Sequence, residues 1–96
     1  MNPIQYKPKD KDAFALEENG QRIAEMIVDI NQGILSVYHT GVLESAQGRG
    51  LGTRLIDAMV AHAREHQLKV FTYCPFVKRH FQRHAYEYAD VWQKEL

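Results

Sequence analysis

Three glycines at alternate positions, Gly48, Gly50 and Gly52, stand directly before a segment with the pattern of a long helix. Glycine disfavours helices, so its repeated use at a helix entrance needs another explanation. The first amides of a helix have no intrahelical partner, and the helix N-terminus carries partial positive charge. Glycines leave those amides uncapped and let an anion approach closely. The run therefore predicts a phosphate site; the alternative is a turn that only admits the chain to the helix.

Polar side chains beside the glycines narrow the choice of phosphate ligand. Thr53 adds a hydroxyl, and Arg49 and Arg54 add two cations. The sequence contains no Gly-Lys pair, which excludes the mononucleotide P-loop pattern. The dinucleotide pattern G-x-G-x-x-G also fails, because Thr53 or Leu55 occupies the position of its last glycine. The pattern that remains is Q-x-x-G-x-G over residues 47–52.

Cys74 and His39 are the two side chains outside this run that are best suited to chemistry. Cys74 is the single cysteine, so the chain forms no internal disulfide, and it is followed by Pro75. A lone cysteine acts either as a small buried apolar residue or as a reactive thiol. His39 can exchange protons near neutral pH.

The first half of the chain has the pattern of an antiparallel meander. Residues 21–30 alternate apolar and polar side chains, and residues 34–42 are rich in β-branched and aromatic ones. Asn19-Gly20 is a favoured hairpin turn, and residues 31–33 form a second turn signal. We therefore expect strands at 13–18, 21–30 and 34–42, joined by two tight turns.

The second half has the pattern of a strand–helix–strand crossover. An apolar stripe with a four-residue repeat predicts an amphipathic helix over 49–67. A buried strand over 68–73 and a shorter helix over 76–83 follow. Right-handed crossovers make the flanking strands parallel, so residues 47–53 and Cys74 should share one edge of the sheet. The predicted fold class is α/β (α+β), in the order β-β-β-α-β-α.

Composition places the chain among ordinary globular domains. Its 96 residues, 45% of them hydrophobic, suit a single domain over 1–96 with a flexible segment at 1–12. Residues 1–48 hold four basic and seven acidic residues, and residues 49–96 hold eight basic and five acidic ones. This asymmetry is too weak for nucleic acid but suits a small anion held by the second half. We expect no membrane span, a cytoplasmic location, and a monomer or weak homodimer.

Residues 62–66, "HAREH", formally match a zinc-protease pattern. They fall in the last turns of the predicted helix, away from the glycines, and their histidines should project largely to solvent. We therefore interpret the match as chance and expect no metal.

The Q-x-x-G-x-G pattern, set between a strand and a long helix, resembles the pyrophosphate-binding motif of the GNAT superfamily of acyl-CoA-dependent N-acetyltransferases. The resemblance extends through "YHTGV", "QGRGLGTRLIDAMVAHARE" and "LKVFTYCPFVKRHFQRH", about residues 34–90, and is to very small, single-domain members. These lack the N-terminal helices that help larger relatives build the acceptor pocket. The resemblance implies a minimal GNAT fold.

The resemblance also implies that acetyl-CoA, or coenzyme A, is the co-substrate and that an amine, small molecule or peptide, is the acceptor. The pyrophosphate would bind main-chain amides of the glycine run, and pantetheine would lie between the two parallel strands. The implied contacts are Thr40, Gly41, Val42, Gln47, Gly48, Arg49, Gly50, Leu51, Gly52, Thr53, Arg54, Pro75, Phe76 and Arg79.

Cys74 and His39 are then the catalytic candidates, with two mechanisms open. In direct transfer, His39 removes a proton from the attacking amine and Cys74 orients groups or protonates the departing thiolate. In the covalent route, Cys74 takes the acetyl group before passing it on. Many members place a glutamate base on the third strand, where this sequence has Gly41, and this departure favours His39. The alternative function is a non-catalytic module that binds or senses acyl-CoA.

Overall fold

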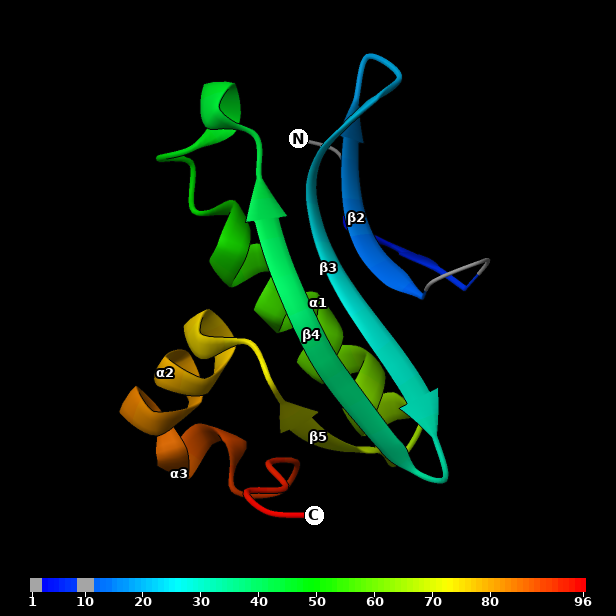
Figure 1. Ribbon diagram of the computed structural model, residues 1–96, viewed down its shortest axis with the longest axis vertical. Coiled ribbons are helices and arrows are strands. Elements are labelled where there is room, and N and C mark those ends of the chain that lie inside the picture. Colours follow the sequence, from blue (N-terminus) through cyan, green and yellow to red (C-terminus); the bar gives the residue numbers. More distant parts are fainter. Residues whose placement is uncertain (1–2, 9–11) are drawn as a thin grey trace.

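The structure is a computed structural model, and it describes residues 3–8 and 12–96. Its five strands form one mixed sheet in the order β1-β2-β3-β4-β5 (Figure 1). No helix among the described residues is long and apolar enough to cross a membrane. The strands are β1 (Gln5–Lys7), β2 (Ala13–Glu18), β3 (Gln21–Asn31), β4 (Ile34–Val42) and β5 (Lys69–Thr72). The helices are α1 (Leu51–Glu65), α2 (Pro75–Arg83) and α3 (Ala85–Tyr88), with a 3₁₀ turn at Glu44–Ala46.

The expected meander is confirmed: β2, β3 and β4 pair antiparallel in sequence order. Both hairpins turn on a residue with positive φ followed by glycine, Asn19-Gly20 (52° and 78°) and Gln32-Gly33 (51° and 79°). Two successive positive φ values match the twist of the flanking strands, which explains these residue types.

The expected parallel crossover is also confirmed, because β5 pairs parallel with β4 through α1. Pairing stops early: Val37 and Thr72 are the last partners, and the amide of Tyr73 donates to the carbonyl of Val37 at 2.8 Å. Strand β4 continues to Val42, whereas the other chain segment turns into α2 at Pro75. We call the gap beyond these last contacts the splay between β4 and β5.

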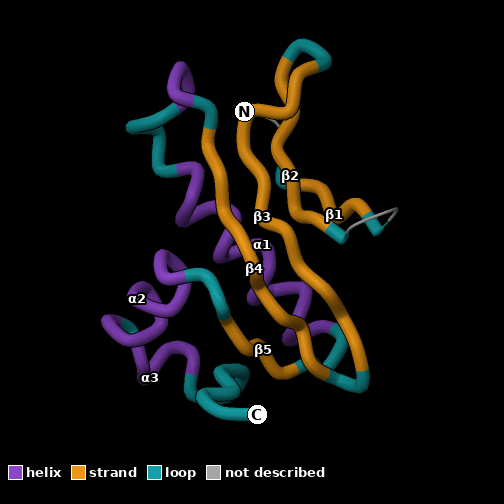
Figure 2. Tube along the Cα trace, viewed as in Figure 1, coloured by secondary structure: helices purple, strands orange, loops and turns teal. Residues whose placement is uncertain are grey.

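Helix α1 packs on one face of the sheet, which we call the helix face. In Figure 2 it is the purple coil behind β3 and β4. Its predicted apolar stripe is confirmed, since the six stripe residues are buried. No helix of the described residues crosses the opposite, open face of the sheet. The stripe residues are Leu51, Leu55, Ile56, Met59, Val60 and Ala63.

Two short elements lie outside the sequence prediction. Residues 5–7 form strand β1, although residues 1–12 were expected to be flexible; residues 1–2 and 9–11 lie outside the described residues. Helix α3 packs on α2, where Tyr88 stacks on Phe81, and the tail after it lies along β5, where Trp92 forms a parallel bridge with Val70. Both elements are too short to carry a clear periodic pattern.

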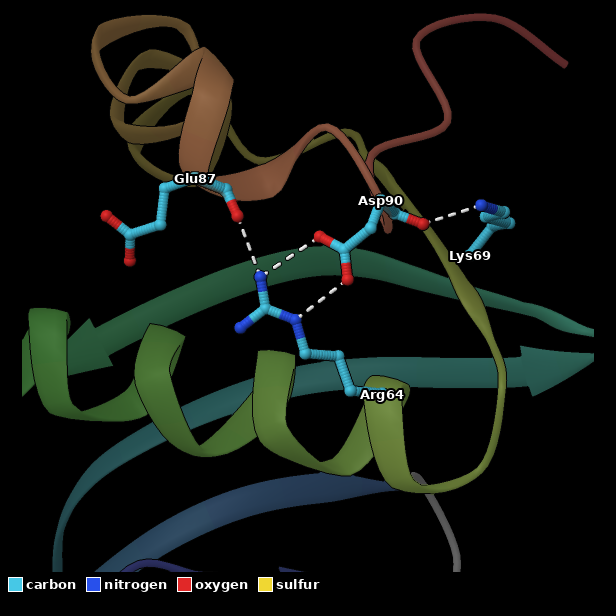
Figure 3. A network of polar contacts seen from close by, with 4 residues as sticks. All are labelled: Arg64, Lys69, Glu87 and Asp90. Carbon is cyan, nitrogen blue, oxygen red and sulfur yellow. Dashed lines mark hydrogen bonds and ion pairs between the residues drawn. The ribbon is translucent and has the colours of Figure 1, made fainter.

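A polar network fastens the C-terminal segment to α1 (Figure 3). The guanidinium of Arg64 contacts both carboxylate oxygens of Asp90 at 3.0 Å and the carbonyl of Glu87 at 2.7 Å. The ammonium of Lys69 donates to the carbonyl of Asp90 at 2.6 Å. The hydrogen bond from Arg64 lowers the pKa of Asp90. The network thus holds the tail beside β5.

Two histidines pack against aromatic side chains, and burial lowers the pKa of each below the ordinary value of 6.5. The ring centroid of His62 lies 4.5 Å from that of Tyr6 and 4.3 Å from that of His66. The expectation that His62 projects largely to solvent is therefore wrong. His80 lies 3.0 Å from the Tyr88 hydroxyl.

These lowered pKa values predict how stability depends on pH. The unfolded chain binds more protons at these histidines, so the free energy of unfolding should fall as pH drops below about 6.5. Glu18 and Asp90 are carboxylates with a lowered pKa. They change the pH dependence of stability only near and below their ordinary pKa values of 4.5 and 3.8. In urea unfolding between pH 7 and 5, the double variant His62→Gln/His80→Gln should show a shallower dependence. An unchanged slope would show that these two histidines do not determine the pH dependence.

Candidate acyl-coenzyme A site

The entrance of α1 presents uncapped main-chain amides. Gly48 and Gly50 have φ values of 85° and 72°, the left-handed conformation that side chains disfavour. Gly50 is the N-cap, and none of the described side chains caps the helix. The first main-chain bond of the helix among the described residues runs from the Arg54 amide to the Gly50 carbonyl, at 3.1 Å. We call residues 47–53 the glycine loop. The Gln47 amide donates to the Glu44 carbonyl at 3.3 Å, and the amides of residues 48–53 remain available to an anion.

A pocket of about 560 Å³ opens over the glycine loop. It is bounded by the end of β4, by the loop, by the first turn of α1 and by one residue of α2. The lining residues are Thr40, Val42, Ala46, Gln47, Gly48, Gly50, Leu51, Gly52, Thr53 and Phe76. The pocket therefore joins the uncapped amides to the splay between β4 and β5.

The N-termini of α1 and α2 meet at this pocket. A Cβ on Gly52 would lie 2.7 Å from the ring carbon Cζ of Phe76, so the ring covers this glycine. Neither helix has an acidic residue in its first turn. Two positive helix ends therefore face the same corner, which favours a ligand with more than one negative charge.

The contact between Gly52 and Phe76 gives a stability prediction. Within a helix, glycine to alanine normally stabilises a protein by up to about 0.5–1 kcal/mol, and Gly52 is the second residue of α1. In Gly52→Ala the new Cβ must displace the Phe76 ring, so we expect little or no gain. In a Phe76→Ala background the same change should recover the normal gain. Urea unfolding of the wild-type protein, the two single variants and the double variant measures this coupling. Additive effects would show that the ring does not pack on Gly52.

The arginines of the glycine loop differ in their contacts. Arg49 makes a two-pronged ion pair with Glu18 at the end of β2, at 2.7 and 3.2 Å. The hydrogen bond from Arg49 lowers the pKa of Glu18. Arg49 is absent from the pocket lining, and its guanidinium is committed to this pair. The side chain of Gln47 instead donates to the Val42 carbonyl at 3.3 Å and ties the loop to β4.

Cys74 lies on the helix-face side of the splay. It is 6% exposed, and its thiol donates to the Thr40 hydroxyl across the splay at 3.5 Å. The hydroxyl of Thr72 accepts from the Cys74 amide and donates to the Cys74 carbonyl, both at 3.0 Å. Pro75 follows as the first residue of α2. The thiol is therefore held beside β4, next to pocket residue Thr40.

His39 lies on the other side of the sheet. It pairs in register with Ile27, while Val37 pairs with the buried Val28, so Tyr38 forms a bulge between the two pairs. The bulge places His39 on the open face together with Gly41. A Cβ added to Gly41 would lie 3.0 Å from the Nε2 atom of the His39 ring. The structure therefore does not bring His39 and Cys74 together on one face.

The predicted contact residues divide accordingly. Nine of them line the pocket, and Ala46 lines it without having been predicted. Gly41 lies on the open face, while Pro75, Arg79 and Arg54 lie on helices without lining the pocket. Nothing in the sequence marks Ala46 as a site residue, because its small apolar side chain only lines the pocket and carries no reactive or polar group. Among the described residues, no three His, Cys, Asp or Glu side chains form a group that could hold a metal ion.

The comparisons with known proteins agree with this geometry. A family model described as GCN5-related N-acetyl-transferase matches residues 13–91. A GCN5-like protein of Staphylococcus aureus is 28% identical, with a TM-score of 0.70 over 100% of this chain and 94% of its own. No curated protein sequence matches the chain.

Larger structures show the same fold at lower identity. Tetrahymena GCN5 is 22% identical with a TM-score of 0.64, over 78% of this chain and 50% of its own. A GNAT-family acetyltransferase of Brucella melitensis, solved in complex with acetyl-CoA, is 21% identical with a TM-score of 0.55, over 71% of this chain and 50% of its own. This chain therefore matches only half of each larger protein. By fold, by the α1 entrance and by the family match, it belongs to the GCN5-related N-acetyltransferase family.

Proposed function

We propose that this protein transfers the acetyl group of acetyl-CoA to a primary amine. The observation that carries the proposal is the row of uncapped amides at the entrance of α1, which opens into a pocket leading to the splay. A diphosphate needs several donors and positive potential, and this corner offers main-chain amides and two helix N-termini. The single free cysteine is consistent with a reducing compartment, so we place the reaction in the cytoplasm.

The two faces of the splay suggest separate roles in the reaction. The pocket and Cys74 lie on the helix face, and His39 lies on the open face. Acetyl-CoA would thus approach from the helix face and the amine from the open face, meeting between the strands. Holding both reactants in this geometry lowers the entropic part of the barrier.

The proposed step is direct transfer. The nitrogen of the neutral amine attacks the thioester carbon, a C–N bond forms, and the C–S bond breaks to release coenzyme A as thiolate. His39 accepts the proton that the attacking nitrogen loses, directly or through water, and that proton finally neutralises the thiolate. The Cys74 thiol contacts the hydroxyl of pocket residue Thr40, and in this step the pair would help to orient the thioester. Direct transfer is favoured over the covalent route, because His39 lies on the wrong face to activate Cys74.

Thiol release from acetyl-CoA, measured with a panel of primary amines, tests this proposal. We expect release that depends on both amine and protein, with stoichiometric acetylated amine detected by mass spectrometry. Stabilisation by acetyl-CoA without amine-dependent release would instead identify a module that senses acyl-CoA.

A further inference from the structure

Three aromatic side chains gather on the open face at the splay, and we call them the aromatic patch: Phe71, Tyr38 and Tyr73. The rings of Tyr38 and Tyr73 stack with centroids 5.2 Å apart and planes within 5°. Phe71 meets Tyr73 edge to face at 4.9 Å. Tyr38 and Tyr73 are nonetheless 48% and 54% exposed. No described residue hydrogen-bonds either hydroxyl, so the core does not explain why these rings are here.

The position of the patch links it to the reaction. The amide of Tyr73 makes the last main-chain hydrogen bond between the two segments, so the stack stands where the splay begins. His39 follows Tyr38 directly on β4 and lies on the same open face. An acceptor resting on the patch would therefore hold its amine beside the proposed base and at the mouth of the splay.

Carboxylates border the patch along β3. Strand alternation places Glu25, Ile27 and Asp29 on the open face, opposite the buried side chains of this strand. Asp29 is exposed and stands in register with Ser36, which is in register with Phe71. Glu25 lies at the other end, about 13 Å along the strand, and pairs with Arg22 at 3.0 Å. The open face thus offers aromatic surface and an aliphatic residue flanked by negative charge.

We propose that the acceptor is a free aliphatic polyamine, a chain of methylene groups carrying two or more ammonium groups. This inference rests on the proposed function. Aromatic faces attract a cationic amine, and Asp29 attracts a second cation of the same chain. Methylenes between the cations lie over the apolar side chains of this face. The ammonium group beside His39 first releases a proton to solvent water, and the resulting neutral amine is the nucleophile of the step above.

Steady-state kinetics with spermidine, butylamine and 4-aminobenzoate test the inference. Spermidine should give a kcat/KM about 10-fold or more above that of butylamine, which carries one cation, and 4-aminobenzoate should be the poorest acceptor. Tyr38→Leu/Tyr73→Leu should raise the KM for spermidine about 10-fold with little change in kcat, because each exposed ring contributes about 2–5-fold. Asp29→Asn should raise that KM about 3–5-fold and leave butylamine unaffected.

Tyr86→Leu is the matched control, because Tyr86 is a fully exposed tyrosine on α3, away from the splay. It should leave every KM unchanged. Equal use of butylamine and spermidine, a KM indifferent to the patch, or acetylation of a lysine peptide alone would overturn the inference while the acetyltransferase proposal stands.

A measurement of spermidine binding tests the inference even if the protein shows no turnover. Spermidine should raise the melting temperature of the coenzyme A-bound protein, and the Tyr38→Leu/Tyr73→Leu variant should lose this increase. If no amine releases thiol, the proposed function fails, and this binding result alone decides whether the patch holds a polyamine. An absent or unchanged increase overturns the inference.

Discussion

Gly50→Glu should abolish the thermal stabilisation that acetyl-CoA gives to this protein. Gly50 is the uncapped N-cap of α1 and lines the pocket over the glycine loop. A glutamate there would place a carboxylate beside the amides proposed to hold the diphosphate, and like charges would repel. Glutamate also disfavours the φ of 72°, which would distort the loop itself.

The expected effect is large enough for a simple melting experiment. Acetyl-CoA at a hundred times its Kd stabilises the native state by about 2.7 kcal/mol. Each kcal/mol raises the melting temperature of a domain of this size by about 4–8 °C. The normal protein should therefore gain about 10 °C or more, and Gly50→Glu should gain almost nothing.

Gly33→Glu separates loss of the site from loss of stability. Gly33 has a similar φ of 79°, and a Cβ added to it would meet nothing within 4 Å, but it lies in the β3–β4 hairpin at the other end of the sheet. This variant should lower the starting melting temperature yet keep the full increase with acetyl-CoA. A full increase in Gly50→Glu would refute the assignment of the glycine loop.

The second large effect concerns His39. His39→Gln should lower kcat for amine acetylation about 100-fold or more, the usual contribution of a positioned general base, and leave the acetyl-CoA-dependent increase in melting temperature intact. Cys74→Ser should cost less, about 10-fold, since serine keeps a hydrogen bond toward Thr40 but does not fill the same buried space. Assays that are quenched at fixed times and quantify the acetylated amine give kcat for both variants.

His66→Gln is the control for His39, because His66 is an exposed histidine just after α1, away from the splay. It should leave kcat unchanged. Full activity in His39→Gln would remove the proposed base. A greater loss in Cys74→Ser, together with an acetylated Cys74 in single-turnover mass spectra, would establish the covalent route instead.

The sequence predicts the main elements because strong local patterns specify them. Asn19-Gly20 has the chemistry of a hairpin turn, and the stripe from Leu51 to Ala63 has the period of a helix buried on one side. The glycine loop is predicted for the same reason, since a run of glycines before such a helix has few other uses.

The relation between His39 and Cys74 depends on a feature that the sequence does not display. Simple alternation would put Val37 and His39 on the same face of β4, because they are two residues apart. The bulge at Tyr38 reverses this and sends His39 to the open face. Bulges arise from the fit between strands. The one residue of this strand that is typical of a bulge is Gly41, whereas the register shift lies at Tyr38.

Long-range contacts are the other part that local patterns miss. The ion pair of Arg49 with Glu18 joins the end of β2 to the glycine loop, far apart in sequence, and it occupies a cation expected to face phosphate. Strand β1 has only three residues, Gln5–Lys7, and is held by pairing with β2. Such features depend on which segments meet in space, and local propensity does not determine that.

The proposed function depends on the amides of the glycine loop, which we propose bind the diphosphate of acetyl-CoA. Two-dimensional ¹⁵N–¹H spectra recorded during titration with acetyl-CoA test it most directly, with S-acetylpantetheine, which lacks the diphosphate, as the control ligand. The amide signals of Gly48, Gly50, Gly52 and Thr53 should shift strongly with acetyl-CoA and little with S-acetylpantetheine. Saturation with acetyl-CoA that moves other signals and leaves these four in place would contradict it.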